Sequence, residues 1–184
     1  MSRTPPKILA VKTLAHTRHF QVEAVDLAFS NGASARFERL RGSEAGAVLI
    51  VPMQDADHVL LIREYAAGTE RYELGLPKGR IENNEPVLDA AQRELREETG
   101  QGAHALEHLT TLTSNPAYSG QKTHIVVAES LYPDPLEGDE PEPIEVAAWP
   151  IESIDQLLAG GEFTEARSLA ALYLVRDLLR SRRT

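Results

Sequence analysis

The sequence contains no cysteine and no long apolar run. Without cysteine there can be no disulfide, no thiolate metal ligand and no cysteine nucleophile. A lack of disulfides is typical of proteins in the reducing cytoplasm. No apolar run approaches the ~18 residues that a membrane-spanning helix requires. The first residues also lack the apolar core and cleavage site of a secretory signal. We therefore expect a cytoplasmic protein with no membrane partner.

Positive charge is also scarce, with 19 Lys and Arg against 28 Asp and Glu and a net charge of -9. Proteins that bind nucleic acid usually carry a basic patch, so we expect no nucleic-acid partner. An anionic substrate would need added cations to approach such a protein. The 184 residues suit one domain with a sizeable core, or one domain and a small appendage.

Residues 8–41 have the composition of strands, with Asn31-Gly32 at the turn of a predicted hairpin. The stretch "GSEAG" after them is typical of a linker. A sheet this small buries too little apolar surface to be stable alone, so it must pack on the main domain or on a second chain. We predict an antiparallel sheet over residues 1–45 that forms a homodimer, followed by a main domain over residues 46–184.

The main domain mixes short apolar runs with amphipathic segments, which predicts an α/β or α+β fold in layers. One helix is expected to begin with Pro86 at its first position and to stop at Gly100. The last helix has Thr164 as its expected cap. The other elements expected are strands in 46–52, 58–64, 69–75, 123–129 and 144–149, a short helix in 150–161 and an acidic, proline-rich loop in 132–145.

Three carboxylates, on Glu94, Glu97 and Glu98, fall within one turn of the helix that ends at Gly100. They repel one another, and the dipole at the C-terminal end of a helix disfavours anions. A bound Mg²⁺ or Mn²⁺ ion would offset both penalties, because carboxylate oxygens suit these ions. The alternative is a solvated charged face that Arg93 and Arg96 screen. Beside the carboxylates lies an apolar stripe, formed by Val87, Leu88, Ala91 and Leu95.

The wider spacing favours the metal site. Gly79 is followed after five residues by Glu85, after seven more by Arg93-Glu94-Leu95, and then by Glu97-Glu98 and Gly100, each after one residue. This spacing resembles the Nudix box, G-x5-E-x7-R-E-U-x-E-E-x-G-U, in which U is apolar. Gln101 is the one departure. The resemblance implies an α/β/α sandwich with a mixed sheet, preceded along the chain by the small N-terminal sheet. It also implies a Mg²⁺-dependent hydrolase of nucleoside diphosphate compounds.

The resemblance also implies roles for the box residues. Glu94 and Glu98 would bind the metal, and Glu97 would bind it or orient the attacking water. A backbone carbonyl, of Lys78 or Gly79, would complete the ligands.

The remaining box residues would support this site. Arg93 would hold the carboxylates by charged hydrogen bonds, unless it is an ordinary surface ion pair. Glu85 would support the geometry between loop and helix, and Gly100 would end the helix.

Residues outside the box resemble the ADP-ribose pyrophosphatase branch of the family, and within it the type that hydrolyses ADP compounds. Pro116 and Tyr118 stand at the positions of the substrate signatures for ADP-ribose and for diadenosine polyphosphates. Their alternatives are a turn residue and a packing aromatic. The resemblance implies a substrate among ADP-ribose, diadenosine polyphosphates and NADH, with AMP and a second phosphate as products.

Five further residues are candidates by this resemblance. Glu140 or Glu142 would act as the general base, although either can be a merely solvated acid of the loop. Arg63 and Glu73 would contact substrate, or be a surface arginine and a strand cap. Phe20 would stack on adenine across the dimer interface, or belong to the core.

Two other functions stay open at this level. The first is a Nudix pyrophosphatase of another nucleotide, such as a nucleotide sugar. The second is a module that binds ADP-ribose without catalysis. Such modules usually lose box carboxylates, and this chain has all of them.

Overall fold

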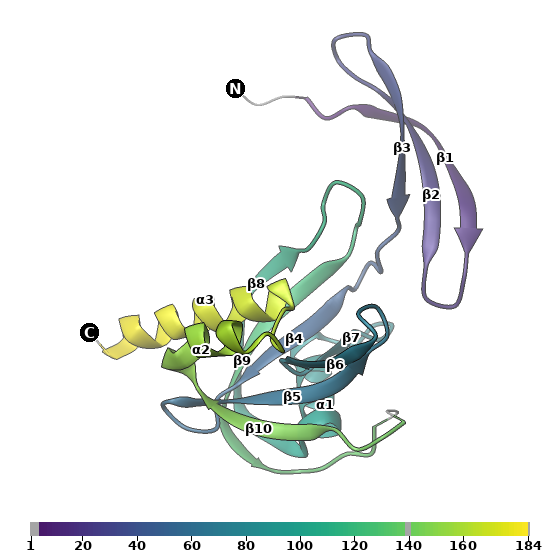
Figure 1. The fold of residues 1–184 in the computed structure, drawn as a ribbon. Coiled ribbons are helices and arrows are strands. Elements are labelled where there is room, and N and C mark those ends of the chain that lie inside the picture. Colours follow the sequence, from purple (N-terminus) through teal and green to yellow (C-terminus); the bar gives the residue numbers. More distant parts are fainter. Residues whose placement is uncertain (1–3, 139–140, 184) are drawn as a thin grey trace. The chain divides into compact units, whose positions relative to one another are not determined.

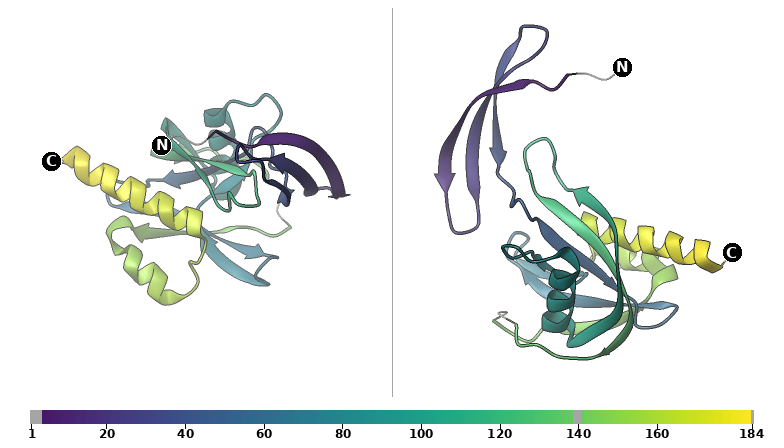
Figure 2. Two further views of the ribbon diagram at one scale, coloured as in Figure 1. Left: turned by 90° about the horizontal axis from the view of Figure 1, so that it is seen from above. Right: turned by 180° about the vertical axis from the view of Figure 1, so that it is seen from behind.

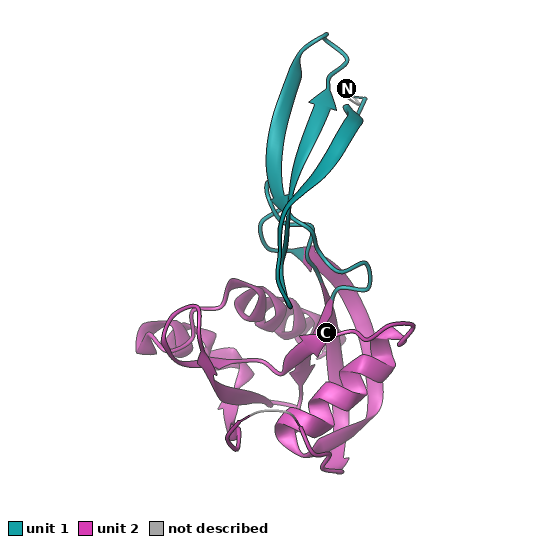
Figure 3. Cartoon of the chain, turned by 90° about the vertical axis from the view of Figure 1, so that its right-hand side faces the viewer, with its two compact units in different colours: residues 1–46, 113–122 teal, residues 47–112, 123–184 magenta. Residues whose placement is uncertain are grey.

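The computed structural model describes residues 4–138 and 141–183, and the chain divides into two compact units. The first unit combines residues 1–46 with residues 113–122, and the second combines residues 47–112 with residues 123–184 (Figure 3).

The first unit contains an antiparallel sheet of three strands in the order β1-β2-β3 (Figure 1). The strands are β1 (Lys7–His16), β2 (Gln21–Ala28) and β3 (Ser34–Leu40). The predicted hairpin is confirmed, because Gly32 takes a φ of 86° and the Asn31 side chain accepts a hydrogen bond from the Ala33 N–H. Every residue of β1 is exposed, which leaves its apolar side chains in solvent within this unit.

The linker glycine Gly42 packs against residues 113–122 of the same unit. A Cβ atom at Gly42 would overlap the Gly120 backbone, so only glycine fits this approach. The Leu40 N–H donates to the Tyr118 carbonyl at 2.7 Å, and the Gly120 N–H donates to the Leu40 carbonyl at 3.1 Å. These bonds attach the 113–122 segment to the end of β3.

The second unit contains two sheets, and the predicted mixed sheet is confirmed. Its order is β7-β4-β9-β8, with β4 parallel to β9 and antiparallel to β7. An antiparallel sheet has the order β10-β5-β6. The strands are β4 (Ala47–Pro52), β5 (His58–Ala66), β6 (Arg71–Gly75), β7 (Lys78–Arg80), β8 (Gln101–Thr113), β9 (Lys122–Pro133) and β10 (Glu145–Pro150). Strands β7 and β8 were not among the predicted elements.

Helices cover the strands of this unit from two sides, which confirms the layered α/β arrangement. Helix α1 (Val87–Thr99) lies on one side of β4 and β9, and α2 (Ile154–Gly160) and α3 (Ala166–Arg183) lie on the other (Figures 1 and 2). A short 3-10 helix, η1 (Ile151–Ser153), leads into α2. None of the helices in residues 4–138 and 141–183 is long and apolar enough to cross a membrane.

The start of α1 differs from the prediction by one residue. Pro86 is extended, with a ψ of 147°, and stands before the helix as its cap, so Val87 is the first helical residue. Gly100 ends the helix in the left-handed region, as predicted, with a φ of 70°. Leu88 was expected in the buried stripe but is 38% exposed, whereas Ala90 is fully buried.

The predicted cap of α3 is wrong. The Ser168 N–H donates to the Glu165 carboxylate at 2.8 Å, so Glu165 caps the helix. The Thr164 hydroxyl donates instead to Glu73 at 3.1 Å. A charged carboxylate at this end also interacts favourably with the helix dipole.

Candidate active site

The three carboxylates of α1 lie between the helix and the strands. Glu94 is 8% exposed and Glu98 is 5% exposed, and both belong to the face that also buries Ala91 and Leu95. Glu97 is partly buried beside them. Because two of the three carboxylates are buried, the cluster is not a solvated charged face. A carboxylate that loses its water without gaining a partner lowers stability.

Arg93 is the only cation that binds several of these carboxylates among the described residues. Its guanidinium donates to Glu85 at 2.9 Å, to Glu94 at 2.8 Å and to Glu97 at 2.9 Å. A further hydrogen bond, of 3.0 Å, goes to the Arg80 carbonyl. The hydrogen bonds to Glu85 come first among the causes that raise the pKa of Arg93. Such a shared guanidinium organises the cluster, as a surface ion pair would not.

Glu98 receives much less compensation. The Lys78 N–H donates to its Oε2 at 2.9 Å. Burial raises the pKa of Glu98 to about 8, against which the Lys78 charge and hydrogen bond act only in part. Burial also raises the pKa of Glu94, despite its bond to Arg93. When its carboxylates are ionised, the cluster therefore holds more negative charge than its own cation, Arg93, neutralises.

The surplus charge fits a divalent cation bound by hard oxygen atoms. In the described residues no group of three or more His, Cys, Asp or Glu side chains converges as a finished ligand cage. The donors that are present, carboxylates held by Arg93 and by a backbone N–H, are those that such an ion prefers.

The box glycine has a steric reason. A Cβ atom on Gly79 would overlap the carboxylate of Glu94, so a larger residue would displace that carboxylate. Glu85 closes the preceding loop, because its carboxylate accepts a hydrogen bond from the Glu82 N–H at 2.9 Å. The hydrogen bonds from Arg93 lower the pKa of Glu85.

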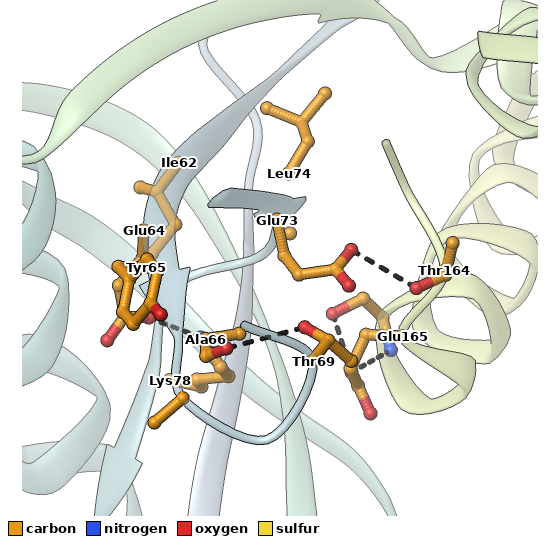
Figure 4. Close-up of a pocket in the computed structure, with 13 residues that line it drawn as sticks. Ile62, Glu64, Tyr65, Ala66, Thr69, Glu73, Leu74, Lys78, Thr164 and Glu165 are labelled. Atoms are coloured by element: carbon orange, nitrogen blue, oxygen red, sulfur yellow. Dashed lines mark hydrogen bonds and ion pairs between the residues drawn. The ribbon is translucent and has the colours of Figure 1, made fainter. Parts of the chain in front are cut away.

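A cavity of about 500 Å³ in the second unit is lined by Glu64, Glu73, Lys78 and the start of α3 (Figure 4). Lys78 connects it to the carboxylates, because its ammonium group pairs with Glu64 at 2.9 Å while its N–H reaches Glu98. Glu73, a predicted substrate residue, accepts hydrogen bonds from Arg71 and Thr164, and the bond from Arg71 comes first among the causes that lower its pKa. Glu64 was missed by the sequence analysis.

A smaller cavity of about 200 Å³ is lined by Arg63 and Glu142 among others. Arg63 forms ion pairs with Glu162 at 3.0 Å and with Glu145 at 3.4 Å. Glu142 accepts a hydrogen bond of 2.6 Å from the Tyr72 hydroxyl. Glu140, the other candidate base, lies outside the described residues.

The three other candidates, Phe20, Pro116 and Tyr118, belong to the first unit. Phe20 is 62% exposed, so it is not a core residue within that unit. Pro116 and Tyr118 line a cavity of about 500 Å³ together with apolar side chains of the sheet, such as Ile8 and Phe37. Their relation to the carboxylates of the second unit stays a prediction.

Comparisons with known proteins agree with this geometry. Residues 44–172 match the NUDIX domain, and residues 6–39 match the NudE-type Nudix hydrolase N-terminal domain. The chain is 52% identical to the ADP compounds hydrolase NudE of Escherichia coli (strain K12), over 95% of this chain and 94% of that protein. It is 28% identical to the ADP-ribose pyrophosphatase of Bacillus subtilis (strain 168), over 90% of this chain and 92% of that protein.

A solved structure, titled as the crystal structure of ADP compounds hydrolase, aligns with a TM-score of 0.92 and 50% identity. The alignment covers 99% of this chain and 98% of that one. With a box that places its carboxylates on a buried helix face and a family match over most of its length, the chain belongs to the Nudix hydrolase family.

Proposed function

We propose that this chain hydrolyses the diphosphate of ADP-containing compounds, such as ADP-ribose, diadenosine polyphosphates and NADH, and releases AMP and a second phosphate. The observation that carries the proposal concerns Glu94 and Glu98 on α1. Both carboxyl groups are buried, and their hydrogen bonds and positive neighbours do not offset the cost of that burial. The names of the similar proteins from Escherichia coli and Bacillus subtilis support the choice of substrate class.

Mg²⁺ is the proposed cofactor, with Mn²⁺ as a substitute. Glu94, Glu98 and Glu97 would hold it together with the backbone carbonyl of Lys78. When bound, such an ion neutralises phosphate oxygens and makes water a stronger nucleophile. Arg93 keeps the carboxylates in place through the hydrogen bonds described above.

The other polar residues would act on water and substrate. Glu97 or Glu142 would accept the proton from the attacking water. Arg63 and Glu73 would contact the substrate from the walls of the two cavities. Both side chains already pair with opposite charges or hydroxyl groups, so substrate would have to exchange these contacts.

Residues of the first unit would complete the site in a cytoplasmic homodimer. Pro116 and Tyr118 would select the substrate, and Phe20 of a second copy would stack on adenine. The exposed apolar side chains of β1 support a sheet that pairs with another chain. Light scattering tests the dimer, and a monomer at working concentration would overturn it together with the role of Phe20.

The activity is tested by incubating the protein with ADP-ribose and Mg²⁺ and separating the products by anion exchange. We expect AMP and ribose 5-phosphate, no turnover with EDTA, and strongly reduced turnover in Glu98→Gln. Glu82→Gln is the matched control, because Glu82 is an exposed glutamate at a variable position of the box. Tight binding of ADP-ribose without products would instead indicate a non-catalytic module. Turnover of ADP-glucose alone would indicate a nucleotide-sugar pyrophosphatase.

A further inference from the structure

Two tyrosines next to the turn of the β5–β6 hairpin are not explained by the fold. Tyr65 and Tyr72 face each other across the strands, with ring centroids 5.6 Å apart and an angle of 72° between the rings. Each is 50% exposed, although large aromatic side chains bury the most apolar surface when they are inside a protein. A pair of rings left half in solvent is suited to receive a third ring.

The two rings line the smaller cavity together with Arg63, Glu142 and Ile144. Its volume of about 200 Å³ is below the ~300–1,000 Å³ typical of sites that enclose a whole drug-sized ligand. The cavity therefore suits one ring system rather than a complete nucleotide.

The charges around this cavity disfavour phosphate. Its one guanidinium, on Arg63, already pairs with Glu145 and Glu162. The carboxylates of Glu142 and Glu145 both line it, so a phosphate group would meet net negative charge. The same oxygens are good acceptors for an N–H donor, such as the amino group of adenine or the amide of nicotinamide. An uncharged ring with an exocyclic nitrogen matches both the aromatic and the acidic walls.

The cavity also adjoins the larger one, and through it is connected to the carboxylate cluster. Glu64 and Tyr65 line both this cavity and the larger one, as Figure 4 shows for the larger cavity. Glu64 pairs with the Lys78 ammonium group, and the Lys78 N–H donates to Glu98. Two hydrogen-bonded contacts, from Glu64 to Lys78 and from Lys78 to Glu98, thus connect the smaller cavity to the buried carboxylate of Glu98.

The Tyr72 side chain also holds one wall of the smaller cavity in place. Its hydroxyl donates to Glu142 at 2.6 Å, which holds residues 141–145 beside the rings. The bond joins residues that are 70 positions apart, so it shapes the cavity rather than a local turn.

We propose that Tyr65 and Tyr72 bind the aromatic ring on the distal group of ADP compounds, the group joined to ADP through the diphosphate. This inference rests on the proposed function with Glu97 as its general base, because Glu142 lines the cavity of the two tyrosines. It assigns the tyrosines to compounds such as diadenosine triphosphate and NADH, whose distal group ends in a purine or a nicotinamide. ADP-ribose has no such ring and makes no use of the tyrosines. The pair therefore determines which ADP compounds the enzyme prefers.

The test compares kcat/KM for diadenosine triphosphate and NADH with kcat/KM for ADP-ribose in the same preparation. In Tyr65→Leu and in Tyr72→Leu we expect the ratio to fall by about 5- to 150-fold, which corresponds to the 1–3 kcal/mol of one stacked base. Tyr65→Phe keeps the ring and should restore the ratio. Tyr173→Leu, which alters a tyrosine of α3 outside this cavity, is the control and should keep the wild-type ratio.

The outcomes separate this inference from the proposed function. If the wild type turns over no ADP compound, the proposed function fails first. If it turns over ADP-ribose and both leucine variants keep the wild-type ratio, the tyrosine site is wrong. An equal loss for all three substrates would place the shared adenine on the tyrosines and would also overturn the proposal. If one leucine variant does not fold, the other still measures the ratio.

Discussion

Glu98 and Glu165 are glutamates at opposite ends of two helices. Their surroundings shift the pKa of the carboxyl group in opposite directions. Glu98 lies in the last turn of α1, where the helix dipole disfavours a carboxylate, and burial raises its pKa to about 8. Glu165 caps the start of α3, where the dipole favours a carboxylate. Burial acts to raise the pKa of Glu165 as well, but hydrogen bonds and the charge of Arg167 outweigh it, and the net pKa is lowered.

The difference lies in what each carboxylate receives from the protein. Glu165 accepts hydrogen bonds from the Arg167 side chain at 2.7 Å and from the N–H and hydroxyl of Ser168 at 2.8 Å each. Glu98 accepts one from the Lys78 N–H. A carboxylate that the protein satisfies contributes to stability, whereas one left short of partners is a position for a ligand. The two residues thus contrast a carboxylate that the protein satisfies with one that the proposed function assigns to a metal ion.

The largest effect should come from Glu98→Gln. We expect kcat/KM for ADP-ribose to fall by roughly 100-fold or more, because changes that act only through a neighbour of a metal ligand already cost about 10- to 100-fold. In EDTA and above pH 8, where Glu98 is ionised, the free energy of unfolding should not fall, because glutamine removes a buried charge that lacked compensation. Enzyme kinetics and urea unfolding measure the two quantities on one preparation.

This prediction would be contradicted by a loss of stability as large as the loss in Glu165→Gln. Such a result would mean that Glu98 is satisfied in the folded protein and that the contrast between the two glutamates is not real.

The next effect concerns the contact that places Glu94. In Gly79→Ala the new methyl group should push the Glu94 carboxylate aside, and kcat/KM should fall by about 10- to 100-fold. The stability cost should be small, because the displaced atoms are the end of a flexible side chain. Gly160→Ala is the matched control, since nothing lies within 4 Å of the added methyl group. Equal activities of the two variants would argue against a role for the Glu94 position.

The sequence predicted the position of Glu98 on its helix better than the cap of α3. The spacing from Gly79 to Gly100 is local, and it fixes both the helix and the side on which its carboxylates lie. The burial of Glu94 and Glu98 follows from their position beside the apolar stripe.

Contacts between distant residues were not predictable in the same way. Strand β7 has only three residues and is a strand because it pairs with β4. The Tyr72–Glu142 bond spans 70 positions, and the Arg63–Glu162 bond spans 99. The cap of α3 was assigned to Thr164 by its residue type, but Thr164 bonds to Glu73 on β6, and the neighbouring Glu165 caps the helix. Tertiary contacts decided each of these cases.

A smaller effect is expected for Glu165→Gln. The loss of the charged cap should lower the free energy of unfolding by about 1 kcal/mol, which is typical of a helix cap. Glu137→Gln, a change at an exposed glutamate, should leave that free energy within about 0.5 kcal/mol of the wild-type value. The single tryptophan, Trp149, is partly buried and donates to the Ser153 carbonyl at 3.1 Å, so its fluorescence can follow urea unfolding. A variant as stable as the wild type would show that the hydrogen bonds of Glu165 add nothing net.

The smallest effect is the pH dependence of the difference in unfolding free energy between wild type and Glu165→Gln. Because the pKa of Glu165 is lower in the folded protein than its ordinary value of 4.5, its carboxylate stabilises the fold above pH 4.5. As the pH falls below 4.5, the unfolded chain takes up the proton first, and the contribution is lost as the pH passes through the folded pKa. The gap in unfolding free energy between wild type and Glu165→Gln should therefore be constant from about pH 7 to pH 5.5 and should shrink toward pH 3.5. Dilute samples are needed, since the pI is about 5.2. A gap that widens toward low pH would mean that burial, as at Glu98, prevails at Glu165 too.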